Sequence, residues 1–76
     1  ENTRFSIYPN PARDVINIKS NVQRYEYQLI NSLGQIVVSG VSVSENTIQI
    51  NNMNKGVYFL KLVADGEVTV NKIMIQ

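Results

Sequence analysis

Apolar and polar residues alternate along most of this chain with a period of two, which is typical of β-strands. The alternating runs recur roughly every 8 to 12 residues and are separated by Gly, Pro, Asn and Asp. No segment carries an uninterrupted helical stripe, so we predict an all-β domain built as an antiparallel sandwich or barrel. Strands are expected at residues 4–8, 14–19, 25–29, 35–39, 47–50, 57–63 and 68–75.

The breaks between these runs carry residues that favour turns. Pro9-Asn10-Pro11 ends the first strand because two prolines fix φ and lack the N–H group of a sheet ladder. Gly34 is expected to adopt a positive φ in a hairpin turn over residues 31–34, and Asp65-Gly66 is typical of a type I′ hairpin. Residues 40–46 are expected to form a connection that is partly extended.

Two runs depart from simple alternation. Residues 57–63 are apolar on both faces, which predicts a central strand that is covered on both sides. In residues 68–75 the apolar positions change parity after Val70. A β-bulge near Asn71 and Lys72 is expected to reconcile the two phases.

The composition excludes most catalytic chemistry. There is no histidine and no cysteine, so a Ser-His-Asp triad, a Cys-His pair, the usual zinc sites and disulfides are impossible. The acidic residues are scattered, and Asp65 and Glu67 flank a turn where solvated charges are expected. No calcium or phosphate-loop motif is present. We therefore expect no enzymatic activity, no catalytic residue, no metal and no cofactor.

Charge and hydropathy limit the classes of partner that the chain can be expected to bind. The net charge is +1 and the basic residues are dispersed, so a nucleic-acid partner is not expected. No apolar run reaches the roughly 18 residues of a membrane-spanning helix. The first residues carry neither a Met nor the features of a signal peptide, so the chain is expected to be part of a longer protein.

Tyrosines offer the one candidate binding surface that composition suggests. Tyr8, Tyr25, Tyr27 and Tyr58 could form an aromatic platform for sugar rings, or they could pack in the core with their hydroxyls at the rim. We favour packing, because alternating aromatic residues on strands usually pack. A carbohydrate- or matrix-binding sandwich module remains the alternative function, and a domain that only stabilises an upstream enzyme is a third.

Several motifs, taken in order along the whole chain, resemble the type A C-terminal sorting domain of the type IX (Por) secretion system. The motifs are Phe5-x-Ile7-Tyr8-Pro9-Asn10-Pro11-Ala12, Val15-Ile16-x-Ile18, Leu29-Ile30-Asn31-Ser32-Leu33-Gly34-Gln35-x-Val37, Ile48-x-Ile50, Met53, Gly56-x-Tyr58-x-Leu60-x-Leu62 and Lys72-Ile73-Met74-Ile75-Gln76.

The resemblance implies a fold and a role. The fold is an immunoglobulin-like antiparallel β-sandwich of about seven strands, with residues 1–76 forming a single C-terminal sorting domain of a larger secreted cargo protein. The role is a secretion signal that takes its parent through the periplasm and across the outer membrane of a Gram-negative cell, to the surface or beyond. The implied partners are the outer-membrane machinery, a sortase that removes the domain and anchors the cargo, and the upstream cargo domain.

The resemblance also suggests which residues the machinery recognises. By analogy this is the terminal segment Lys72, Ile73, Met74, Ile75 and Gln76, and an end strand can be offered to a partner sheet by strand addition. A second interpretation, which is compatible with recognition, places Ile73 and Ile75 in the core and gives the charge of Lys72 the role of preventing unwanted edge pairing. Exposed edge strands also allow a homodimer.

A second set of residues is expected to be structural, because it shapes the first corner and the turns. The set comprises Tyr8, Pro9, Asn10, Pro11, Ala12, Gly34, Gly56 and Tyr58.

Overall fold

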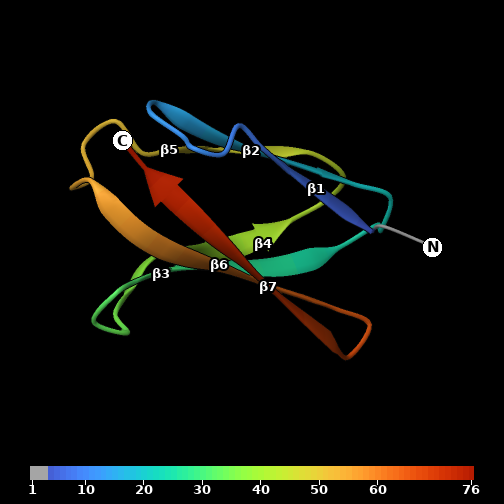
Figure 1. Ribbon diagram of the computed structural model, residues 1–76. Helices are drawn as coiled ribbons and strands as arrows, with labels where there is room; N and C mark the ends of the chain where they lie inside the picture. The colour runs from blue at the N-terminus through green and yellow to red at the C-terminus, as the bar shows by residue number, and fades with distance from the viewer. Residues whose placement is uncertain (1–3) are drawn as a thin grey trace.

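The structure is a computed structural model that describes residues 4–76, and residues 1–3 of the expected domain lie outside the described part. Two antiparallel sheets pack face to face (Figure 1). One sheet has the order β1 (Phe5–Tyr8), β2 (Val15–Ser20) and β5 (Asn46–Gln49). The other has the order β4 (Ile36–Ser42), β3 (Tyr25–Asn31), β6 (Gly56–Ala64) and β7 (Glu67–Ile75). The predicted all-β sandwich of seven strands is confirmed.

The strand order is that of an immunoglobulin-like sandwich. The first, second and fifth strands share one sheet, and the third, sixth and seventh share the other. The fourth strand lies beside β3, whereas in a constant-type immunoglobulin domain it lies beside the fifth strand. Residues 4–76 contain no helix that is long and apolar enough to cross a membrane.

The core lies between the sheets, where every second residue of the long strands points inward. An edge-to-face contact between Phe5 and Tyr25, with ring centroids 5.2 Å apart, links the two sheets at one end. Such aromatic pairs add about 1 kcal/mol beyond the area they bury. The buried apolar residues are Ala12, Ile16, Ile18, Tyr25, Leu29, Ile48, Ile50, Tyr58, Leu60, Leu62, Ala64, Ile73 and Ile75.

Two hairpin turns follow the sequence prediction. Gly34 has φ of +84°, and the Asn31 side chain accepts hydrogen bonds from the N–H groups of Leu33 and Gln35, both at 2.9 Å. Asp65 and Gly66 have φ values of +53° and +79°, as a type I′ turn requires. Both positive-φ glycines were identifiable because few other residues tolerate this conformation.

The fourth strand is longer than predicted. It continues through Gly40 to Ser42, opposite Tyr27 and Tyr25, so the expected connection begins later. The register of this pair shifts between Leu29 and Ile30, which leaves Val37 as an extra residue. The irregularity of the sheet therefore lies in the β3–β4 pair.

The bulge predicted in the last strand is wrong. The β6–β7 register runs without a shift from Gly56 opposite Ile75 to Ala64 opposite Glu67. Val68 and Val70 keep their phase and lie on the outer face, where they are 58% and 57% exposed. The parity change records a switch in which face of β7 is apolar.

The prediction of a central strand was right for β6, but the prediction that it is covered on both sides was wrong. β6 lies between β3 and β7, and its inner residues are buried against the other sheet. On the outer face Phe59 is 37% exposed, and Val57 and Val63 are half-buried. Within residues 4–76 no second layer lies on this face.

Candidate functional site

The terminal segment combines core and surface side chains. Ile73 and Ile75 are buried and face Tyr58 and Gly56 of β6 in the sheet register. Lys72, Met74 and Gln76 are exposed on alternate positions. The alternation agrees with the core interpretation of the two isoleucines and leaves three side chains for contact with a partner.

The outer edge of this terminal segment is covered by residues 10–12. Asn10 Nδ2 donates to the carbonyl of Lys72 at 3.0 Å, and Asn10 Oδ1 accepts from the N–H of Met74 at 3.1 Å. The N–H of Ala12 donates to the carbonyl of Met74, and the N–H of Gln76 donates to the carbonyl of Ala12, both at 2.8 Å. The backbone groups that an added strand would use are therefore already bonded.

The sequence of the Tyr8–Ala12 corner, which follows β1, explains this contact. Pro9 and Pro11 lack N–H groups and cannot extend the β1–β2 ladder. Their peptide bonds to Tyr8 and Asn10 are both cis. The Asn10 amide supplies one donor and one acceptor, as a backbone unit does, and Ala12 is fully buried beside Ile75. Figure 1 shows the C-terminus beside the β1–β2 connection.

Two sets of residues that the sequence suggests are separate thus lie together. The Tyr8–Ala12 corner is predicted to be structural and residues 72–76 to be recognised, yet residues 10–12 hydrogen-bond along the outer edge of residues 72–76. An Asn between two prolines was the signal available in the sequence, but nothing in the pattern shows which strand it contacts. Strand addition at residues 72–76 would require residues 10–12 to leave.

Gly56 and Tyr58, which belong to the same structural set, lie at the end of the four-stranded sheet that also holds residues 72–76. Gly56 has φ of +144° at the start of β6, a conformation that favours glycine, and it pairs with Ile75. The buried Tyr58 donates its hydroxyl to the carbonyl of Asn54 at 2.7 Å, which ties the strand to the preceding turn. Gly34 lies in the separate β3–β4 turn.

At the opposite end, Arg4 joins the first strand to the β6–β7 turn. Its guanidinium donates to Asp65 and Glu67, both at 2.6 Å. These hydrogen bonds, first to Asp65 and then to Glu67, raise the pKa of Arg4 above its usual value. The carboxylates of Asp65 and Glu67 were expected to be solvated, and they are exposed. The sequence did not reveal their pairing with Arg4, because Arg4 lies more than 60 positions from either of them.

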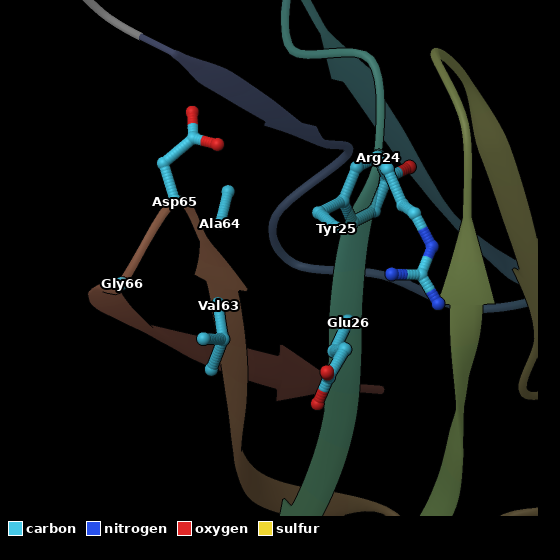
Figure 2. Close-up of a pocket in the computed structure, with 7 residues that line it drawn as sticks. All are labelled: Arg24, Tyr25, Glu26, Val63, Ala64, Asp65 and Gly66. Atoms are coloured by element: carbon cyan, nitrogen blue, oxygen red, sulfur yellow. The ribbon is translucent and has the colours of Figure 1, made fainter.

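A hollow of about 280 Å³ lies near this turn, lined by residues 24–26 and 63–66. Figure 2 shows that the carboxylates of Glu26 and Asp65 point away from each other, so the charged groups do not converge. Burial raises the pKa of the Tyr25 hydroxyl, and the nearby Ser42 side chain offsets part of this rise. The hydroxyl oxygen makes no hydrogen bond of good geometry among the described residues. In residues 4–76 no three acidic side chains lie close enough together to hold a metal ion.

The tyrosines do not form a common exposed platform. Tyr25 and Tyr58 are buried, and Tyr27 packs against the core. Tyr8 is 48% exposed but belongs to the other sheet. The geometry matches the packing interpretation for Tyr25, Tyr27 and Tyr58, but not for Tyr8.

Fold and site together define a small antiparallel β-sandwich domain. Comparison with known families agrees with this class. Residues 6–76 match the family described as the secretion system C-terminal sorting domain, and the chain belongs to this family, the sorting domains of type IX secretion.

A curated relative carries a similar segment. The chain is 33% identical over 73 residues to β-agarase D of Zobellia galactanivorans. The match covers 95% of this chain and 15% of the agarase, so the chain spans a small part of that protein's length. The family is one of sorting signals and is not an enzyme family.

Proposed function

We propose that this domain directs a larger parent protein across the outer membrane, and that the machinery contacts the exposed side chains of residues 72–76. The family match supports the sorting role, which implies export to the cell surface or secretion. The ordered terminal strand supports the proposal that the machinery contacts residues 72–76. It is paired with β6 on one edge and held by residues 10–12 on the other.

A strand held on both edges presents its side chains in one geometry. Lys72 and Met74 lie on the outer face of the sheet, and Gln76 follows the last strand residue. An ordered surface costs little conformational entropy when a partner binds it. A cation beside an exposed thioether and an amide gives the machinery a small mixed contact surface.

The test uses the parent protein in a bacterium that carries the type IX system. Lys72→Glu combined with Met74→Glu alters the outward side chains and leaves Ile73 and Ile75 in place. We expect export to fall at least about tenfold, as for loss of a central contact. Val41→Glu, on the outer face of β4, is the matched control and should export normally. Normal export of the double variant would contradict the proposed surface.

We further propose that a sortase removes the domain and anchors the cargo at the cell surface. The match to only 15% of a longer protein, β-agarase D, supports an upstream cargo in the same chain. Mass spectrometry of surface-exposed parent protein should find the cargo without residues 6–76 and joined to a surface glycolipid. Surface cargo that retains the domain intact would argue against removal.

A further inference from the structure

The four edge strands of the sandwich differ in how well they are protected. β1 and β5 are only four residues long, and the edge strand β4 is interrupted by the irregularity at Val37. Short strands and bulges are the usual protection against edge-to-edge pairing. β7 has nine residues, no register shift and no proline.

Only part of the β7 edge is covered. Residues 10–12 bond to the outward groups of Lys72, Met74 and Gln76. The backbone N–H and C=O groups of successive strand residues point alternately to the two edges of the strand. Those of Val68 and Val70 therefore point to the outer edge of β7, as those of Lys72, Met74 and Gln76 do. Within residues 4–76, no strand pairs with β7 on that side. An open edge that carries two exposed valines, Val68 and Val70, therefore remains at residues 67–71.

We propose that this open edge pairs with the same edge of a second copy of the chain, antiparallel and centred on Thr69. In this register Val68 of each copy lies opposite Val70 of the other, and each such pair exchanges two backbone hydrogen bonds. The exposed valine side chains then form one cluster on the outer face of a continuous sheet. β-branched pairs across strands are favourable.

The covered half of the edge selects this register. The added ladder ends at Val70, because Asn10 already occupies the Lys72 carbonyl. Lys72 of one copy lies opposite Gly66 of the other, near Asp65 and Glu67, which pair with Arg4 of their own chain, and no like charges face each other. Shifting the centre to Val70 would place Met74 in the pairing, where Asn10 and Ala12 already occupy the edge. Pairing of an edge with itself also closes after two copies, whereas β7 against β4 would continue into a fibre.

The pairing is independent of the sorting role and involves a small area. Interfaces well below about 1,000 Å² are weak, so association is sought by sedimentation from roughly 10 μM to 1 mM chain. Val70→Pro removes an outward N–H without removing a bond to β6, a position where edge strands accept proline. We expect it to weaken association about tenfold.

Val41→Pro is the matched control, because alternation also directs the N–H of Val41 away from its sheet on the opposite edge, and its side chain is similarly exposed at 52%. It should associate as the unmodified chain does. A monomer at all concentrations, or equal effects of the two prolines, would overturn the proposal.

A second measurement does not depend on any variant folding. In the unmodified chain, amide exchange at Val68 and Val70 should slow as concentration rises, while exchange at Val41 stays constant. Concentration-independent exchange at both valines would equally overturn the pairing.

Discussion

Asn10 shows how one side chain can take the place of a strand. Its amide bonds to Lys72 and Met74 as the backbone of a neighbouring strand would. The contact satisfies edge groups that an approaching peptide could otherwise use. Its effect on the terminal segment can be measured in the isolated domain.

Replacing Asn10 by aspartate should destabilise the fold by about 1–3 kcal/mol. The new carboxylate cannot donate to the Lys72 carbonyl and is repelled by it, although it still accepts from Met74. Denaturant unfolding measures the loss, and amide exchange at Gln76 should accelerate as the segment loosens. Asn52→Asp, at an exposed turn position, is the control and should change stability by less than about 0.5 kcal/mol. Equal stability of the two variants would contradict the role of Asn10.

Tyr25 presents the opposite case, a buried hydroxyl without a partner among the described residues. Tyr25→Phe removes this unsatisfied oxygen and keeps the ring contact with Phe5, so we expect a gain of about 1 kcal/mol in unfolding free energy. Tyr8→Phe, at an exposed position, should be neutral. A loss of stability in Tyr25→Phe would show that the hydroxyl is bonded after all.

The same residue gives a pH dependence. Burial raises the pKa of Tyr25 above its ordinary value of 10.0, so the folded state retains this proton at a pH where the unfolded chain loses it. The unfolded state then binds fewer protons, and stability falls as pH rises above about 10. Alkaline unfolding curves of Tyr25→Phe should show a smaller decline than those of Tyr8→Phe, and parallel curves would contradict this.

At the level of elements, the β3–β4 hairpin depends on a close approach at Gly40. A Cβ atom there would lie 2.7 Å from the hydroxyl oxygen of Tyr27 and 2.9 Å from the adjacent ring carbon. Both contacts are shorter than van der Waals distances, so the Tyr27 ring would have to shift to admit a Cβ atom at this position. The sequence assigned Gly40 to a connection and did not reveal this packing.

Gly40→Ala should therefore cost about 1–3 kcal/mol, as overpacking does. Thermal and denaturant unfolding of the variant and of Ser39→Ala, its neighbour on the outer face, measure the difference. Combining Gly40→Ala with Tyr27→Leu should recover part of the loss, because the smaller side chain removes the clash. A strictly additive double variant would show that the ring does not limit this position.

The element boundaries show which local signals were reliable. Turns at Gly34 and at Asp65-Gly66 were predictable because positive φ restricts the residue type. The parity change in β7 was misinterpreted because exposed valines on an open face look, in sequence, like core residues in a shifted register.

At the level of the whole molecule, the terminal segment is both part of the core and part of the surface. Removing residues 72–76 deletes two buried isoleucines, each worth about 2–5 kcal/mol on truncation. We expect the shortened domain to be largely unfolded, by circular dichroism, and the parent to remain unexported. Loss of export on this deletion would therefore not by itself prove recognition of the segment.

Single substitutions separate the two contributions. Ile75→Ala should unfold the domain at lower denaturant concentration, whereas Met74→Ala, at an exposed position, should unfold nearly as the unmodified domain does. If Met74→Ala nevertheless lowers export of the parent, recognition is involved. Equal destabilisation by both substitutions would contradict the inward and outward assignment of these side chains.

The sequence by itself determined the all-β class, the seven strands, most turns and the family, because alternation, turn residues and ordered motifs are local properties of the chain. It also excluded His- and Cys-based chemistry, which depends on composition alone. Only the tertiary structure decided that Asn10 and Ala12 cover the terminal strand, that Arg4 joins the last turn and that, within the described residues 4–76, the outer face of β6 stays open. These features arise from contacts between residues far apart in sequence, and hydrophobic periodicity carries no information about which distant segments meet.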